Sequence, residues 1–376
     1  MSRVIFSESS HANDSRIGKL ETALKVFIEK EADEVSKKKD YENILFKAET
    51  SEHFAETYAL SDGLGQWTAG PEGSTPENDS FGETFKKIIE HNEFRKGFVI
   101  TKKMLDDCTA TQIGVQAGDV AKQFVNSYQE TINKCLVEAL TKAATPTADL
   151  INGSYIRFNN GLIDVTTGDG KPLFAKNHDY GLATLHGAGT QSNYFYVPSA
   201  NVSIDPAALE ELLNYLSVTM RNIKDENGNP MGYSYDTIII PGDNFLLEQC
   251  VRKALGSGYL PFGAANGADS SVINTQYGKK NLIVLPEWST AAADNANEII
   301  LMSSEAKDNL HGNVFLQRVP MDVINEIDFD TRNWKWNGYA RWGVGFGSYK
   351  HICRLTFSAD ATQDTALAAV ATAVSY

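Results

Sequence analysis

Three glycines near the end of the sequence, Gly343, Gly345 and Gly347, have a spacing that invites a chemical interpretation. A phosphate-binding P-loop needs the pattern GxxxxGK[ST], and a dinucleotide site needs GxGxxG between a strand and a helix. The segment "GVGFG" has neither pattern, and "SYKHICRLTF" after it has the composition of a strand. The alternating glycines instead predict a strand that packs closely over large neighbouring rings, because a missing side chain lets two surfaces approach.

Two other groups could carry chemistry. His178 and Asp179 lie in "GDGKPLFAKNHDYG", but the sequence has no GxSxG nucleophile motif and no second histidine at metal-ligand spacing. We therefore expect His178 to hydrogen-bond within a loop rather than to catalyse. A soluble enzyme would have to use residues such as Asp243 or His311 in a cleft, and no motif supports that alternative. We expect no enzymatic activity, no cofactor and no metal.

The cysteines are widely separated along the chain. None of Cys108, Cys135, Cys250 and Cys353 belongs to a CxxC pair or a Cys/His cluster of the zinc type. Isolated, buried thiols in a reducing compartment are the expected interpretation.

Composition and charge exclude several classes of protein. The chain has 376 residues and 42% hydrophobic content, enough for a large core and for roughly two to three domains. Its 34 basic and 48 acidic residues give a net charge of −14, which opposes broad binding to nucleic-acid phosphates. The first residues lack the apolar run of a signal peptide, and no segment approaches the ~18 apolar residues of a membrane span. We expect a chain that stays in a cytosol-like medium.

The first hundred residues suggest two projections. Residues 17–35 have apolar side chains at helical spacing among many Lys and Glu, which predicts an exposed amphipathic arm. Residues 54–101 alternate around the turn-rich "TAGPEGSTPENDSFG", which predicts one long hairpin. Its first limb is acidic and its second limb basic; the charged residues are Glu56, Asp62, Glu72, Glu77 and Asp79, then Lys86, Lys87, Arg95 and Lys96. A hairpin with such a charge split is expected to contact a partner.

The strongest periodic signal follows the hairpin. Apolar residues recur every three or four positions from about Thr111 to Ala144, which predicts a helix roughly 50 Å long at 1.5 Å per residue. The stripe does not keep a strict heptad, so we expect a strut across a flat domain rather than a coiled coil. Trp336 and Trp342 are predicted to pack beside this helix.

A compact α/β or α+β domain with a central sheet is predicted over 206–320. Asp205 and Pro206 have the character of an N-cap and a first helical residue, and "DTIIIPGDNFLLEQCVRKALG" indicates a buried strand, a turn and a helix that ends at Gly256. The runs "NLIVLP" and "EIILMS" add two apolar strands. After 320 the chain becomes rich in strand-forming residues again.

The order of these pieces resembles a known family. An arm, a long hairpin, "GFVITKKMLDD" before a long helix, a "DGKPLFAKNH" loop, a sheet domain and a closing "RWGVGFGSYKHICRL" are similar to the major capsid proteins of tailed bacteriophages with the Hong Kong 97 fold, nearest the Mu-like branch. The resemblance implies an α+β fold divided into an N-terminal arm (1–52), an E-loop (53–101), a peripheral domain with a spine helix (102–205), an axial domain (206–320), return strands (321–358) and a tail (359–376).

The resemblance also implies a structural function. It predicts pentamers and hexamers of this chain in a shell that encloses double-stranded DNA without sequence-specific binding, assembled in the host cytoplasm with scaffold, portal and decoration proteins and without a membrane. Expected assembly contacts are Trp67, Glu72, Glu77, Lys86, Lys87, Arg95 and Lys96. An encapsulin-like compartment shell is the alternative within the same fold.

Overall fold

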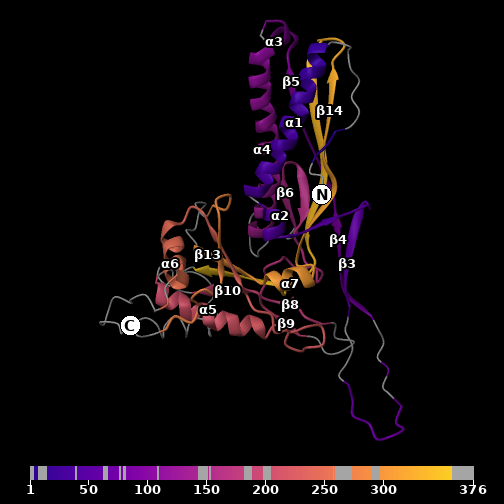
Figure 1. Cartoon of the computed structure of the whole chain (residues 1–376). Coiled ribbons are helices and arrows are strands. Elements are labelled where there is room, and N and C mark those ends of the chain that lie inside the picture. Colours follow the sequence, from indigo (N-terminus) through magenta and orange to yellow (C-terminus); the bar gives the residue numbers. More distant parts are fainter. Residues whose placement is uncertain are drawn as a thin grey trace.

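The computed structural model describes residues 4–6, 15–38, 40–61, 67–75, 78, 82–107, 110–142, 151, 154–181, 189–197, 205–256, 258, 273–289 and 297–357. They form a long lobe, a smaller lobe at its side and a hairpin that projects from their junction (Figure 1). The chain mixes helices with parallel and antiparallel strands, so the predicted α+β class is confirmed.

A twisted sheet and two helices build the long lobe. The strand order is β1-β14-β15-β5, and β2 also pairs with β14. The helices α1 and α4 lie side by side along one face of this sheet (Figure 1). The bounds of these elements are β1 (Val4–Phe6), α1 (Ser15–Lys38), β2 (Lys47–Thr50), β5 (Asn92–Ile100), α4 (Ala110–Lys142), β14 (Asn313–Ile327) and β15 (Trp334–Phe346).

The long helix predicted from the apolar stripe is present as α4. Its buried positions Ile132, Leu136 and Leu140 recur every four residues, as a single helical face requires. The first helix corrects the prediction of an exposed arm, because Leu24 and Ile28 of α1 are fully buried in one cluster with residues of α4. An amphipathic stripe shows that a helix needs a partner, and here the same chain provides it.

The aromatic strand lies under α4, as predicted. Trp336 stacks on Phe98 of β5 with ring centroids 5.7 Å apart and shares a buried cluster with Phe124 of α4. Trp342 stacks on Phe94 at 3.9 Å and belongs to the cluster that contains the second half of α4. Both rings are nearly parallel to their partners; Trp336 lies directly opposite Phe98 in the ladder, whereas Trp342 is a diagonal neighbour of Phe94.

The smaller lobe contains the second sheet, in the order β10-β16-β13-β11-β12. The Asp205 carboxylate accepts a hydrogen bond from the Ala207 amide and begins α5, as predicted. The helices α5 and α6 pack on one face of the sheet, and the other face joins the core of the long lobe. The bounds are β10 (Tyr194–Val197), α5 (Pro206–Arg221), β11 (Thr237–Pro241), α6 (Phe245–Gly256), β12 (Asn281–Leu285), β13 (Asn297–Met302) and β16 (Ile352–Phe357).

This sheet corrects the expected boundaries of its lobe. The strands β10 and β16 lie outside 206–320 yet belong to the sheet, whereas β14 begins at Asn313 and belongs to the other one. The boundaries differ because β14 and β15 are long. Their antiparallel ladder begins at the pair Asn313 and Phe346 and ends at the pair Ile327 and Trp334. Sequence patterns gave the strands but not their partners, which are distant along the chain.

The two lobes share buried polar contacts as well as a core. Arg354 of β16 is buried, donates to the carbonyl of Thr141 at the end of α4 and pairs with Glu298 of β13, both at 2.5 Å. Lys307 is also buried and donates to the carbonyls of Asn43 and Phe46. Because these cations have close partners, they fix how the lobes join.

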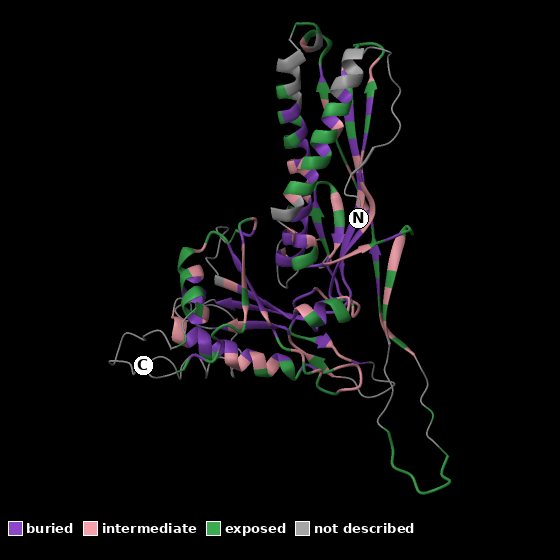
Figure 2. Ribbon diagram, in the orientation of Figure 1, coloured by how far each residue is buried: buried purple, intermediate pink, exposed green. Residues whose placement is uncertain are grey.

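The segment predicted as one long hairpin divides into a shorter hairpin and a strand of the long sheet. Only β3 (Ala55–Ser61) and β4 (Glu83–Glu90) pair with each other, whereas β5 leaves the hairpin and pairs with β15. Figure 2 shows the exposed distal part of this hairpin and the buried residues where it meets the lobes. The remaining elements are α2 (Tyr41–Ile44), α3 (Lys102–Asp107), β6 (Tyr155–Phe158), β7 (Gly161–Asp164), β8 (His178–Asp179), β9 (Thr190–Gln191) and α7 (Ser304–Asn309).

Candidate assembly surfaces

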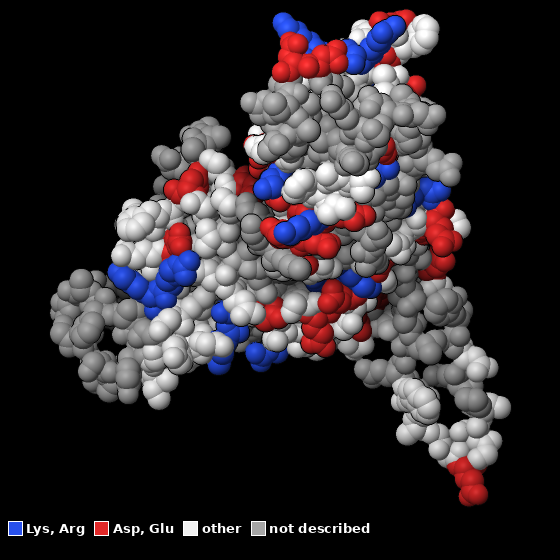
Figure 3. All heavy atoms as spheres, turned by 45° about the horizontal axis from the view of Figure 1, so that its top comes forward, with Lys and Arg blue, Asp and Glu red and all other residues white. Residues whose placement is uncertain are grey.

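The distal part of the hairpin is the most exposed stretch of the described chain. Every residue from 67 to 75 is exposed, and Trp67 has a relative exposure of 101%. Glu72 lies in this stretch, and an acidic side chain marks the tip in Figure 3. Asp62, Glu77 and Asp79 lie outside the described residues. The hairpin therefore presents a large aromatic ring and negative charge with no cover from the described part of its own chain.

The glycine run holds the base of this hairpin. A Cβ built on Gly343 would lie 2.5 Å from the carbonyl oxygen of Glu90, and one on Gly345 would lie 2.6 Å from Cδ1 of Ile89. A Cβ on Gly347 would lie 2.5 Å from the carbonyl oxygen of His311. Real Cβ atoms essentially never make such short contacts, so a side chain at Gly343 or Gly345 would collide with β4, and one at Gly347 with the turn that carries His311. The prediction that these glycines serve packing is confirmed.

Lys86 and Lys87 of β4 have different environments. Lys86 is exposed, whereas Lys87 is buried, with its Nζ 2.7 Å from Oδ2 of Asp164 and 2.9 Å from the hydroxyl of Thr166. Burial lowers the pKa of Lys87, and the nearby Asp164 carboxylate opposes that shift. The charge of Lys87 already has partners within the chain, and its contact with a neighbouring subunit stays a prediction. Strand alternation turns the two lysines to opposite faces.

Arg95 and Lys96 lie on β5, away from the hairpin tip. Arg95 is exposed, forms an ion pair with Glu93 at 2.8 Å and lies 5.5 Å over the ring of Tyr339. Lys96 is also exposed. Among the described strands, β5 is the last of its sheet, and none of them pairs with its outer edge. The structure thus separates the predicted contacts into a hairpin group and a sheet-edge group.

His178 forms hydrogen bonds, as predicted, but it lies in the short strand β8 rather than in a loop. Its side chain is fully buried; Nδ1 lies 2.8 Å from Oδ2 of Asp169, and the ring stacks on Tyr349 at 3.7 Å. Burial by itself raises the pKa of Asp169, but hydrogen bonds from His178 and Thr167 outweigh it and lower that pKa. The contacts hold the "GDGKP" turn against the bend between β15 and β16, which carries Tyr349.

The residues expected of a soluble enzyme are not arranged as a catalytic site. Asp243 is exposed and accepts from the hydroxyl of Ser289 at 2.7 Å. His311 has a φ of 47°, and its ring lies 4.9 Å from that of Tyr58. Within the described ranges, no three His, Cys, Asp or Glu side chains are grouped to hold a metal. The geometry offers neither a nucleophile with its base nor a metal centre there.

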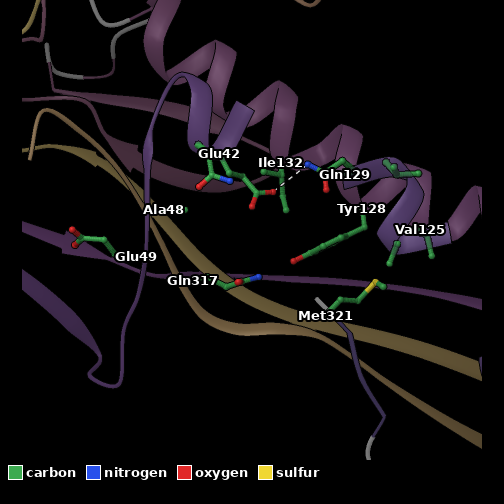
Figure 4. Close-up of a pocket in the computed structure, with 12 residues that line it drawn as sticks. Glu42, Ala48, Glu49, Val125, Tyr128, Gln129, Ile132, Gln317 and Met321 are labelled. Atoms are coloured by element: carbon green, nitrogen blue, oxygen red, sulfur yellow. Dashed lines mark hydrogen bonds between the residues drawn. The ribbon is translucent and has the colours of Figure 1, made fainter. Parts of the chain in front are cut away.

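A cavity of about 280 Å³ lies between α1, α4 and β14 (Figure 4). Gln129 donates to Glu42 across it at 3.1 Å, and Tyr128 and Met321 line another side. On the outer edge of β14, pairing with β2 ends at Gln317 and pairing with β1 starts at Met321. The cavity therefore marks the gap between two N-terminal strands, with a lining typical of a packing junction rather than of a catalytic cleft.

The described cysteines are buried free thiols, as expected. These are Cys135, Cys250 and Cys353. Burial raises the pKa of Cys250 and of Cys353 to about 12, so both remain unreactive thiols near neutral pH. Cys108 lies outside the described residues. In the part of the chain that the structure describes, no helix is both long and apolar enough to cross a membrane.

Comparison with known proteins gives structural but no sequence matches. No family model and no curated protein sequence matches the chain. A chain of Mycobacterium phage Patience is similar over 96% of this chain and 94% of its own, with 12% identity and a TM-score of 0.48. The capsid of Ralstonia phage GP4 matches over 86% and 89%, with 12% identity and a TM-score of 0.46. The capsid of the cyanophage P-SCSP1u matches over 84% and 86%, with 10% identity and a TM-score of 0.45.

Proposed function

We propose that this chain is the major capsid protein of a tailed bacteriophage, of the Mu-like branch, and that it assembles with copies of itself into a shell around double-stranded DNA. The observation that carries the proposal is the hairpin, which ends in the fully exposed Trp67. An isolated two-stranded hairpin is marginally stable in water, and an exposed tryptophan is a common anchor of protein interfaces.

The remaining exposed apolar side chains support an assembling subunit. Phe329 at the end of the β14–β15 ladder is 95% exposed, and Phe245 at the start of α6 is 70% exposed. The parts of the chain that carry them, α6 and the end of the β14–β15 ladder, lie on different parts of an elongated molecule (Figure 1), so a single binding partner of small size would leave most of these side chains in water. Several neighbours around each subunit would cover them, as in obligate assemblies.

The charge fits a container for DNA. A net charge of −14 keeps the wall from binding the phosphate backbone, so the enclosed DNA stays mobile. Asymmetric contacts between identical subunits close into rings, and rings join into a shell. We propose a virion location after assembly in the host cytoplasm, with scaffold, portal and decoration proteins as partners and no enzymatic role. The six-part division into arm, E-loop, peripheral, axial, return-strand and tail segments belongs to the same proposal, with the boundary changes described above.

Particle formation by the purified chain tests this function directly. We expect multi-angle light scattering and negative-stain microscopy to show rings, tubes or shells. Trp67→Ser should weaken assembly by about 30-fold with an unchanged circular dichroism spectrum, since loss of an anchor tryptophan costs on the order of 2 kcal/mol. Tyr155→Ser, at another exposed aromatic, is the matched control. Particles of only 41 kDa at every salt and protein concentration would refute the proposal.

A further inference from the structure

The parallel strands β11 and β12 give the smaller lobe two chemically different ends. Lys279 and Lys280 directly precede β12, whereas Asp243 and Glu287 closely follow the carboxyl ends of β11 and β12. Since the strands are parallel and in register, both lysines lie at one end of the pair and both acids at the other. Five residues of strand separate the ends by roughly 16 Å.

The basic end is a hollow of about 380 Å³ lined by Arg221, Lys279 and Lys280. Lys280 is held in place, because its Nζ donates to the carbonyl of Tyr235 at 2.6 Å. The nearby Asp236 carboxylate accepts hydrogen bonds from the hydroxyl of Thr237 and from the amide and hydroxyl of Ser304. The cations of the hollow therefore outnumber the acids, in a protein whose net charge is strongly negative.

Apolar side chains border this hollow. Val218, which lines it, is 55% exposed, and Tyr277 in the adjoining turn is 57% exposed. The position at the end of α5 adds the negative end of the helix dipole, which the basic residues offset. A surface that combines cations with exposed apolar groups fits a protein partner with carboxylates and its own apolar groups.

The acidic end has that complementary character. Asp243 is exposed. Phe245 and Leu246, which follow it at the start of α6, are 70% and 55% exposed. The Asp243 carboxylate accepts a hydrogen bond from the hydroxyl of Ser289. In Figure 1, α5 follows the lower edge of the smaller lobe and α6 stands near its outer end.

We infer that the smaller lobes of successive copies bind head to tail, with the Asp243 end of one copy in the basic hollow of the next. The contact joins Asp243, Phe245 and Leu246 to Arg221, Val218 and Lys279 of a second copy. Because the two surfaces differ, the contact repeats in one direction and closes into a ring. The inference rests on the proposed function and adds the polarity and the residues of one ring contact.

A charge-swap experiment tests the contact. Variant one carries Arg221→Glu and Lys279→Glu, and variant two carries Asp243→Arg. Each alone brings like charges together at every contact, and we expect about a tenfold loss of assembled protein. An equal mixture restores opposite charges at every contact when the two variants alternate, so even-membered rings should return. Lys103→Glu on α3, at the far end of the long lobe, is the control for a reversed exposed lysine.

A second measurement uses the wild-type chain and needs no variant to fold. A zero-length carbodiimide cross-linker applied to assembled particles should join Lys279 to Asp243, and mass spectrometry of the linked peptides would detect it. The ~16 Å between the two ends of one lobe excludes this link within a chain. Assembly of wild type and both variants alike, or no recovery in the mixture, would overturn the head-to-tail contact. Failure of the wild type itself to assemble would instead overturn the proposed function.

Discussion

Ile89 of β4 occupies the space that any side chain at Gly345 of β15 would need. A Cβ at position 345 would lie 2.6 Å from both Cδ1 and Cγ1 of Ile89. Ile89 is itself almost fully buried, in a cluster with Val314 and Leu316 of β14. This contact fixes the base of the projecting hairpin to the long sheet, so the direction of the hairpin depends on a residue far from its tip.

Replacement of Gly345 by valine should therefore destabilise the fold. We expect a loss of about 1–3 kcal/mol from overpacking, measured by urea denaturation, with a lower soluble yield. The double variant Gly345→Ala with Ile89→Ala should recover part of the loss suffered by Gly345→Ala alone, because the shorter side chain makes room. Gly343→Ala should be worse than Gly345→Ala, since its Cβ would meet a backbone carbonyl that cannot move aside. A Gly345→Val protein of normal stability would contradict the packing role.

Loss of the Lys87 charge should weaken the monomer. Lys87→Met removes the 2.7 Å pair with Asp164 and the bond to Thr166. We expect the free energy of unfolding to fall by about 1–3 kcal/mol, because Asp164 loses its close cationic partner. The loss is no larger because Asp164 is partly exposed and water can solvate its carboxylate. Lys86→Met on the exposed face is the matched control and should change the unfolding free energy by less than about 0.5 kcal/mol. Equal effects of the two variants would show that the buried pair has no special role.

Reversal of the exposed Lys86 should affect assembly rather than folding. We expect Lys86→Glu to leave the circular dichroism spectrum intact and to weaken particles at low salt, because one basic charge of the hairpin becomes acidic. Exposed charges are screened within a Debye length of about 10 Å at 0.1 M salt, so the defect should shrink as salt increases. Electron microscopy at low and high salt measures it. Normal particles in every condition would show that Lys86 is only a solvated surface charge.

The buried His351 predicts a dependence of stability on pH. Burial, and then the nearby charge of Lys307, lower its pKa to about 3, and its Nε2 lies 2.7 Å from Oδ1 of Asn313. The unfolded chain, with an ordinary pKa near 6.5, binds this proton first as pH falls. The contribution of the neutral His351 ring to the free energy of unfolding is therefore complete above about pH 6.5. It decreases as the pH falls from about 6.5 to about 3, by at most about 1.4 kcal/mol per pH unit.

Substitution of His351 should flatten that pH dependence. We expect His351→Gln to be less stable at pH 7, because the amide cannot reproduce the packed ring, yet to lose less stability between pH 6 and pH 4 than the wild type. His53→Gln, at an exposed histidine, is the control and should keep the wild-type slope. Urea denaturation at several pH values measures both variants. An unchanged slope in His351→Gln would assign the acid sensitivity to other groups.

Local patterns in the sequence determined the elements of this protein. The stripe of α4, the cap formed by Asp205 and the close packing at Gly345 were predicted from near neighbours along the chain, and the structure agrees with each. The order of these elements was also sufficient to suggest a capsid subunit. Such signals are readable because helix periodicity and capping act over a few residues.

Only the tertiary structure decided which strands pair and which charges face water. Residues far apart in the chain bring β5 to β15 and β16 to β13, and no local pattern encodes such partners. Lys86 and Lys87 are adjacent and chemically identical, yet one is exposed and the other is buried against Asp164, 77 positions away from it. Alternation along a strand separates two neighbours, but the packing of other segments determines which face becomes the inside.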